Sequence, residues 1–353
     1  MRAIAMAAML LVSLLLAGQA CAAPASVRIG TWNLERLGDG DKKDYASIAA
    51  VAAHVDLLAI QEVMTAQGLD NLKAALERQT HETWSVQASS PVGTAHYKEM
   101  YAMVYRNSAV EYVEGAASYL DRKNVFAREP FSARFRAKAG GEEFALGTVH
   151  VLYGKSAKDR APELAELANY WTWLEEIYPG VPVILVGDFN MNEANPAFDA
   201  LRAHAVPLVT AGASTLSAKD GAFANLYDNV WVSPKDRPGV TAVGVVNYPL
   251  MLHLSHAQAR ATVSDHAPVF VQLGQARLDK AVIMTETPRP PAANDAAYAP
   301  AASGPVRGNR SSHVYHRPQG CPSYNRFSAQ NRVEFASEAE AKAQGYHLAG
   351  NCK

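Results

Sequence analysis

Short apolar runs that end in polar residues are the feature of this sequence that most constrains its fold. Residues 183–190 read VILVGDFN, in which four branched apolar residues lead to Asp188 and Asn190. A run of this length and composition predicts a strand that is buried on both faces. Burying an unpaired carboxylate or carboxamide costs several kcal/mol. These two side chains must therefore have hydrogen-bonding partners or a function at a binding or catalytic site.

The same arrangement recurs between residues 24 and 273. Polar residues flank the runs RIGTW, DLLAIQ, FALGTV, VILVG and APVFVQL, or lie within NLYDNVW: Asn33, Glu62, His150, Asp188, Asn190, Asp228, Asp265 and His266. Strand ends are where side chains can converge on one mouth of a sheet. Carboxylates, carboxamides and imidazoles without a Ser or Cys nucleophile favour hydrolysis by an activated water beside Mg²⁺, Mn²⁺ or Ca²⁺.

Strand patterns outnumber helical ones in this part of the chain. We predict strands at residues 26–34, 56–63, 99–107, 131–137, 142–152, 182–190, 226–233 and 268–273, and helices at residues 45–55 and 159–178. Many strands and few helices predict a layered α/β or α+β domain. The net charge of −1 excludes a uniformly basic nucleic-acid-binding surface, but it allows a local basic cleft.

Residues 1–23 have the layout of a secretory signal peptide, with Arg2, an apolar run and then small residues. The run is short for a membrane-spanning helix. Cleavage after Ala22 or Ala23 fits, and it predicts a secreted or periplasmic protein. A lipid anchor on Cys21 is the alternative, although the residues before it match a lipobox poorly.

The mature chain would keep only two cysteines, Cys321 and Cys352. In an oxidising compartment such a pair predicts one disulfide, and the alternative is a metal site completed by other ligands. Residues 274–305 are rich in Pro and Ala and predict a linker. Residues 306–353 form a small module with seven Lys or Arg and three Glu, a net charge of +4 with neutral histidines. A module this small gains from a covalent link.

Six ordered motifs give the chain a family resemblance. The segments TWNLE, LAIQEV, VGDFN and SDHAP resemble the endonuclease/exonuclease/phosphatase superfamily. The segments PVGTAHYKEMYAMVYRN and FAREPFSARF are similar to parts of secreted deoxyribonuclease I. The resemblance covers about residues 27–273. It implies a four-layered α/β sandwich of two packed mixed sheets with outer helices. It also implies a secreted, divalent-metal-dependent endonuclease that hydrolyses DNA with little sequence specificity and leaves 5′-phosphate ends. We expect a monomer that does not bind membranes.

The resemblance also assigns roles to single residues. His150 and His266 match catalytic histidines, with Glu99 and Asp228 as the carboxylates that orient them, and Asp188 and Asn190 match the pair at the scissile phosphate. Glu62, Asn33 and Asp265 match the metal site, and Tyr97 and Arg128 match residues that contact phosphate.

Two departures from the family change what is expected. The acidic, cysteine-containing loop that binds calcium in deoxyribonuclease I is replaced here by LDRKNVFAREP, so that calcium site is not expected. The C-terminal module carries the segments GNRSSHVYHRPQGCPSYNR, NRVEFASEAEAKAQGY and AGNC. These segments resemble the metal-binding region of the Ada repair protein, which uses four cysteines for zinc. Only two remain here, so zinc would need His313 or His316 as further ligands. A disulfide-closed basic module that helps to hold DNA is favoured.

Two other functions and one local alternative stay open at this point. A superfamily phosphodiesterase of the sphingomyelinase or phosphoinositide phosphatase type is disfavoured by the YKE and REP segments. A non-catalytic secreted DNA-binding protein is disfavoured by the complete set of catalytic residues. Lys155, Lys158 and Arg160 follow His150 as a basic loop, which is either a solvated loop and helix start or a contact with the DNA backbone.

Overall fold

The computed structural model describes residues 26–40, 42–236, 239–274, 305–318, 321, 324, 329–350 and 352. The predicted signal peptide (residues 1–23) and nearly all of the predicted linker (residues 274–305) lie outside these residues. In the described part of the chain, no helix is both long and apolar enough to cross a membrane. The large domain and the C-terminal module (residues 306–353) are described separately.

Seven strands form the first sheet of the large domain. They are β1 (Val27–Leu37), β2 (Leu57–Val63), β3 (Trp84–Ala88), β4 (Val92–Gly93), β5 (Lys98–Arg106), β12 (Val240–Val245) and β13 (Val269–Leu273). Their order is β12-β13-β1-β2-β5-β3, and β4 also pairs with β5. The sheet is mixed, because β1 and β2 run parallel while the other pairs are antiparallel.

Six strands form the second sheet. They are β6 (Val110–Ser118), β7 (Phe131–Ala137), β8 (Glu143–His150), β9 (Val183–Asp188), β10 (Val206–Pro207) and β11 (Asp228–Val232). Their order is β10-β11-β9-β8-β7-β6, and only β8 and β9 run parallel. A parallel pair needs a crossover, and α3 (Ala157–Ile177) supplies it between these two strands.

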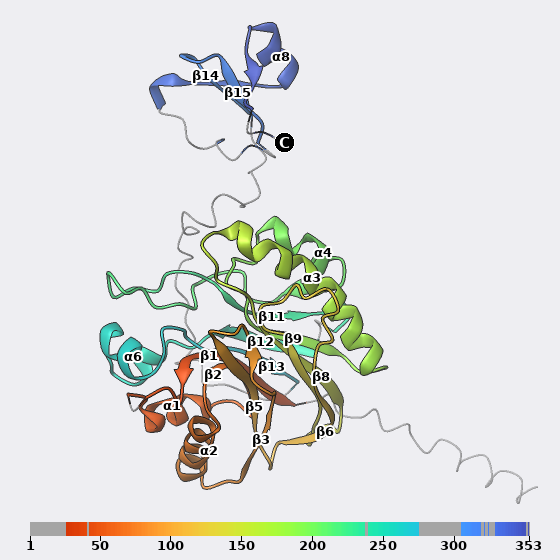
Figure 1. Ribbon diagram of the computed structural model, residues 1–353, viewed down its shortest axis with the longest axis vertical. Helices are drawn as coiled ribbons and strands as arrows, with labels where there is room; N and C mark the ends of the chain where they lie inside the picture. Colours follow the sequence, from red (N-terminus) through yellow and green to blue (C-terminus); the bar gives the residue numbers. More distant parts are fainter. Residues whose placement is uncertain are drawn as a thin grey trace, which may run out of the picture.

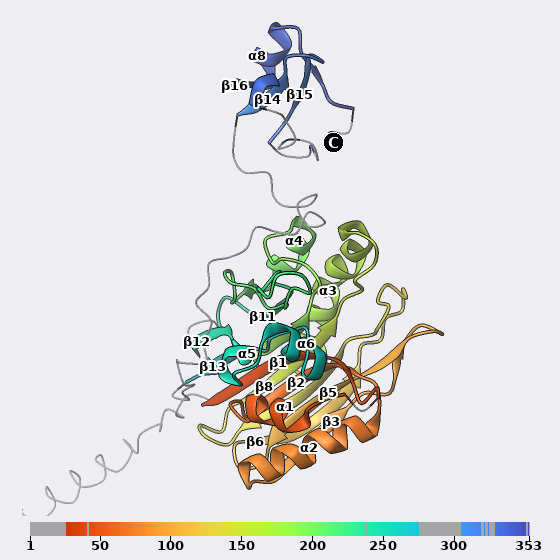
Figure 2. The same ribbon diagram turned by 90° about the vertical axis from the view of Figure 1, so that its left-hand side faces the viewer.

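Helices cover the outer faces of the two sheets (Figures 1 and 2). On the first sheet lie α1 (Tyr45–Ala52) and α2 (Ala66–Thr80), and on the second lie α3 and α4 (Asp199–Arg202). A 3-10 turn (Pro196–Phe198) precedes α4, and the short helices α5 (Tyr248–Met251) and α6 (His256–Thr262) precede β13. The predicted four-layered α/β sandwich is confirmed.

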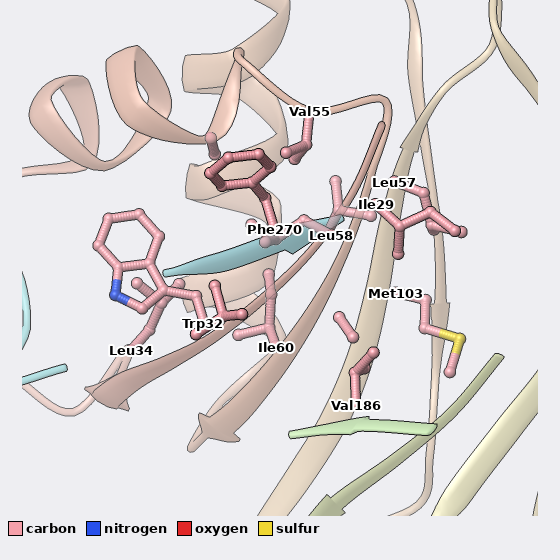
Figure 3. Close-up of a cluster of buried hydrophobic side chains, with 14 of the residues drawn as sticks. Ile29, Trp32, Leu34, Val55, Leu57, Leu58, Ile60, Met103, Val186 and Phe270 are labelled. Carbon is pink, nitrogen blue, oxygen red and sulfur yellow. The ribbon is translucent and has the colours of Figure 1, made fainter. Parts of the chain in front are cut away.

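One hydrophobic core fills the space between the sheets. Figure 3 draws Ile29 of β1, Met103 of β5 and Val186 of β9 in this buried cluster. Along β9 the side chains alternate: Ile184 and Val186 belong to the core between the sheets, whereas Val183 and Leu185 belong to a second core beneath α3. Both faces of β9 are therefore buried, as the unbroken apolar run predicts.

The helix α2 and the strands β3, β6 and β12 were not predicted from the sequence. The signal for α2 was present, because Leu69, Leu72 and Leu76 recur at helical spacing and are buried. Thr65 also caps this helix, since its hydroxyl accepts a hydrogen bond from the amide of Gly68 across 3.1 Å. Polar residues between the leucines concealed the pattern.

Strand register brings three polar side chains into one row across neighbouring strands of the second sheet, where β8 and β9 end and β11 begins. His150 of β8 pairs with Asp188 of β9, and Asp188 pairs with Asp228 of β11. The backbone of Gly187 passes very close to β8, because a Cβ atom at this position would lie 2.1 Å from the carbonyl oxygen of Val149. Its φ of +140° is also strained for any residue with a side chain. The row depends on a glycine here.

Arg160 corrects one of the sequence-based alternatives. It lies at the start of a helix, in the first turn of α3, as one alternative has it, but it is fully buried instead of solvated. Its guanidinium donates hydrogen bonds to the carbonyl oxygens of Tyr153 (2.7 Å) and Asn190 (2.8 Å), and it lies 4.4 Å from the ring centroid of Tyr153. Arg160 thus ties together the segments that follow β8 and β9, and it is not placed to bind the DNA backbone.

The C-terminal module has its own four-stranded sheet, in the order β16-β14-β15-β17. Its elements are β14 (Val306–Asn309), β15 (Val314–His316), β16 (Arg332–Phe335), β17 (His347–Leu348), α8 (Glu338–Ala343) and a 3-10 turn (Ala329–Asn331). The predicted disulfide between Cys321 and Cys352 is confirmed. His316 lies beside it, but two sulfurs bonded to each other are not available to zinc as thiolates.

Replacing Gly187 tests whether the close approach of β9 to β8 holds the site row. We expect Gly187→Ala to lower the free energy of unfolding by about 2–4 kcal/mol, because both backbone strain and a clash oppose the new methyl group. Gly141→Ala is the matched control, since its φ is +74° but nothing lies within 4 Å of the added atom. It should cost about 1–2 kcal/mol from strain alone. Denaturant unfolding measures both variants. If Gly187→Ala and Gly141→Ala lower the free energy of unfolding equally, the close approach of β9 to β8 does not require a glycine.

Candidate active site

The two sheets meet at the row formed by His150, Asp188 and Asp228. From the first sheet, Asn33 of β1 donates a hydrogen bond from Nδ2 to Asp188 Oδ2 across 3.1 Å. The same nitrogen lies 3.0 Å from Glu62 Oε1, at the end of β2. Because Asn33 and Asp188 are both almost completely buried, this bond links the sheets at the base of the site.

His150 forms a hydrogen-bonded pair with Glu99 of β5, as predicted. Its Nδ1 lies 2.8 Å from Glu99 Oε1. Burial alone would lower the pKa of His150, but the Glu99 carboxylate outweighs it and the net pKa is raised. Burial alone would raise the pKa of Glu99, yet His150 and Arg128 lower it below its usual value. The geometry leaves Nε2 of His150 to face the centre of the site.

His266 forms a second pair, with Asp228. The distance from His266 Nδ1 to Asp228 Oδ2 is again 2.8 Å. Burial opposes protonation of His266, but Asp228 and Asp188 raise its pKa well above the usual value. Burial raises the pKa of Asp228 to about 6, and the neighbouring Asp188 adds to the rise. This pair therefore holds a proton strongly.

Asp188 lies between the two imidazoles. Its Oδ2 is 3.6 Å from Nε2 of His150 and also 3.6 Å from Nε2 of His266. Burial would raise the pKa of Asp188, but both histidines and the hydrogen bonds from Asn190 and Asn33 lower it below its ordinary value. Asp188 is thus a buried anion with one protonatable pair on each side.

Glu62 and Asp265 carry carboxylates that are partly open to solvent at this site, because their side chains are 17% and 29% exposed. The backbone of Glu62 has a φ of +61°, and its Oε2 accepts a hydrogen bond from the amide of Arg36 across 3.1 Å. Asp265 Oδ1 lies 3.9 Å from His266 Nε2. Oxygen donors of this kind suit a hard divalent cation.

A second group of possible ligands consists of Asp188, Asp228 and His266. Two of these residues already bond to each other through His266 Nδ1. A metal there would have to compete with this hydrogen bond, so the donor chemistry favours Glu62 and Asp265. Asn33, predicted as part of the metal site, uses its amide nitrogen for Glu62 and Asp188 and its oxygen for the amide of Glu35. It orients Glu62 in this arrangement.

Arg128 and Tyr97, the two residues predicted to contact phosphate, lie near Glu99, the partner of His150. Arg128 is mostly buried, and its Nε donates to the carbonyl oxygen of His150 across 3.0 Å and lies 3.8 Å from Glu99 Oε2. Its Nη2 is buried and has no hydrogen-bond partner among the described residues. The ring of Tyr97 lies between two guanidinium groups, 5.9 Å from those of Arg36 and Arg128.

Asn190 lies beside Asp188, but its predicted conformation was wrong. The sequence predicts one extended strand over residues 182–190, which includes Asn190. Instead β9 ends at Asp188, and Asn190 has a left-handed φ of +50°. Its side-chain nitrogen donates to the carbonyl oxygen of Val151 across 2.8 Å, and its backbone amide donates to Asp188 Oδ1 across 2.8 Å. Phe189, between Asp188 and Asn190, is fully buried.

Two serines that the sequence analysis missed hold the second histidine pair in place. The hydroxyl of Ser264 donates to the carbonyl oxygen of Asn33 (2.6 Å) and accepts from the amide of His266 (3.0 Å). The hydroxyl of Ser214 accepts from the amide of Asp228 across 3.0 Å. Ser264 lies within the SDHAP motif and could have been noticed, whereas nothing in the sequence around Ser214 distinguishes it.

Comparison with known proteins gives the same answer as the geometry. The model of the endonuclease/exonuclease/phosphatase family matches residues 30–266. A deoxyribonuclease from Thioalkalivibrio sp. (strain K90mix) is 44% identical over 271 residues, which cover 74% of this chain and 75% of that protein. Rat deoxyribonuclease-1-like 1 is 27% identical, over 65% of this chain and 74% of that protein.

A solved structure shows the same fold at low sequence identity. An endonuclease/exonuclease/phosphatase family protein from Bacteroides thetaiotaomicron superposes with a TM-score of 0.52 and 21% identity, covering 71% of this chain and 98% of that one. The family model matches most of the large domain, and the alignment with the Thioalkalivibrio deoxyribonuclease is longer still. This chain therefore belongs to the endonuclease/exonuclease/phosphatase family, as a phosphodiester hydrolase of the deoxyribonuclease type.

Proposed function

We propose that this protein is a secreted, divalent-metal-dependent endonuclease that hydrolyses DNA with little sequence specificity and leaves 5′-phosphate ends. The observation that carries the proposal is the placement of two histidine–carboxylate pairs on either side of one buried aspartate. Relatives named deoxyribonucleases support DNA as the substrate. The sequence of residues 1–23 supports secretion, and a disulfide is typical of oxidising compartments.

Glu62 and Asp265 would hold the divalent cation, because they are the exposed oxygen donors beside the histidines. A cation bound there supplies positive charge that neutralises the phosphodiester and favours attack by water. Asn33 keeps the Glu62 carboxylate in place through the 3.0 Å bond. Arg36 contributes a backbone amide to the same carboxylate, so the side chain of Glu62 is fixed before any ligand arrives.

The histidine pairs provide the proton transfers. One pair, or Asp188 acting with it, removes the proton from the attacking water, and the other pair gives a proton to the leaving 3′ oxygen. The carboxylates of Glu99 and Asp228 fix Nδ1 of each ring as the protonated nitrogen of the neutral imidazole, so that each Nε2 faces the reaction. Because both rings are buried, water does not compete for these hydrogen bonds, and the rings keep their orientation.

Arg128 has a guanidinium nitrogen that could donate a hydrogen bond to a phosphate. Arg128 is held by the carbonyl oxygen of His150, while its Nη2 is buried without a hydrogen-bond partner in the described part of the chain. A buried unpaired donor is unfavourable unless a ligand satisfies it, and a guanidinium matches the geometry of phosphate oxygens. This supports the predicted role of Arg128 as a phosphate contact.

The central aspartate is the most direct single substitution. We expect Asp188→Asn to lower kcat at least about a thousandfold, because it removes the charge that both imidazoles share while keeping nearly the same shape. Plasmid cleavage measures the loss, and circular dichroism confirms the fold. Asp199→Asn, at an exposed position paired with Arg202, is the control and should retain full activity. A folded Asp188→Asn protein with normal activity would disprove the assignment.

Metal dependence is tested by nicking supercoiled plasmid with Mg²⁺ or Mn²⁺ and then with excess chelator. We expect nicking with the cation, none with chelator, and recovery when the cation is restored, since the phosphodiester charge would otherwise stay unneutralised. Sphingomyelin should remain intact in a parallel reaction. Nicking that continues in chelator, or a phospholipid hydrolysed in preference to DNA, would reject the proposal.

A further inference from the structure

A pocket of about 480 Å³ opens beside the active site and involves none of the residues with an assigned role. One wall is the turn at residues 217–221, and the other is one face of α6. Lys219, His256 and Arg260 are its charged or titratable lining residues. Its remaining lining residues are small, which leaves room for a ligand between the two walls.

The first wall is bonded to the segment that carries Asp265 and His266, and the second wall leads into this segment along the chain. The amide of Leu216, next to the first wall, donates to the carbonyl oxygen of Asp265 across 2.7 Å. Thr215 forms an isolated β-bridge with His266. The other wall, α6, ends at Thr262, three residues before Asp265. Backbone contacts therefore fix the position of the pocket relative to His266.

Arg260 connects the pocket to the active site through one carboxylate. Its Nη2 lies 3.5 Å from Asp265 Oδ2, while Asp265 Oδ1 lies 3.9 Å from His266 Nε2. Another guanidinium nitrogen of Arg260 donates to the carbonyl oxygen of Leu216, which keeps the side chain between the two walls. A ligand on Arg260 would thus lie next to a phosphate held between the two histidine pairs.

Lys219 adds a positive charge to the lining of the pocket. Its side chain is exposed, and it forms no ion pair with any residue that the structure describes. The adjacent Asp220 accepts a hydrogen bond from the amide of Ala222 within the turn. Asp265 offsets part of the charge of Arg260, and Lys219 is the second cationic side chain of the pocket. The ring of His256 packs edge-on against Phe223 and forms a firm side to the pocket.

We propose that this basic pocket binds a backbone phosphate of the nucleic-acid substrate, next to the phosphate that is cleaved. The inference rests on the proposed function and adds a subsite to it. A nucleic-acid strand carries one negative charge per nucleotide, and each phosphate neutralised by a cation adds a salt-dependent gain in affinity. Lysine binds phosphate as a point charge, and arginine adds directed hydrogen bonds.

Lys219→Ala tests the subsite, with Lys138→Ala as the matched control. Lys138 is also exposed, but it lies in the hairpin between β7 and β8, at the end of β8 far from His150. Two substrates are compared with Mg²⁺ present: an oligodeoxynucleotide, and bis(4-nitrophenyl) phosphate, which has a single phosphate. We expect Lys219→Ala to lower kcat/KM on the oligonucleotide about three- to tenfold at low salt, and to leave the single-phosphate ester unchanged. The slope of log kcat/KM against log salt concentration should also shrink by slightly less than one.

Methylphosphonate substitution locates the phosphate. In the unaltered protein, neutralising one phosphate next to the cleaved bond should reduce cleavage there, and in Lys219→Ala the same substitution should have little further effect. Equal behaviour of Lys219→Ala and Lys138→Ala on the oligonucleotide, or an equal loss on both substrates, would overturn the subsite while leaving the proposed function intact. If the unaltered protein hydrolyses neither substrate, the proposed function fails first.

Discussion

The close pairing of β8 with β9 is the constraint on which the rest of the site depends. Only a glycine at position 187 lets the two backbones approach this far, and this register sets His150 beside Asp188. The antiparallel partner β11 then adds Asp228 to the same row. The bond from Asn33 to Asp188 joins this row to the first sheet, so both halves of the sandwich contribute to one cluster of buried charges.

Buried charges are stable in this cluster because each has a partner. Glu99 and Asp228 each bond to one imidazole, and Asp188 lies near the outward nitrogen of both. An isolated carboxylate at this depth would take up a proton, whereas here the histidines keep the pKa of Asp188 below its ordinary value. The exposed carboxylates of Glu62 and Asp265 stand at the edge of this cluster, where a cation and a phosphodiester could both reach them.

The apolar runs and the polar residues at their ends were sufficient for a layered α/β or α+β domain and for several of the residues that meet at the site. The family resemblance supplied the four-layered sandwich and the roles of single residues such as Glu99. The sequence did not predict the burial or conformation of residues whose contacts lie far away along the chain. Arg160 is buried only because α3 packs over the ends of β8 and β9, and Asn190 leaves the extended conformation because its side chain bonds to Val151. Ser214 and the pocket around Lys219 likewise depend on segments that are brought together by folding.

The central claim is that the two histidine pairs perform different proton transfers. It is tested most directly by comparing His150→Gln and His266→Gln on DNA and on bis(4-nitrophenyl) phosphate, whose leaving group needs no proton. Loss of the general acid should cost about 10²–10⁴-fold on DNA but far less on the activated ester, whereas loss of the general base should slow both substrates. The account predicts that one of the two variants, and not the other, recovers on the activated ester. Recovery of both variants, or of neither, would contradict it.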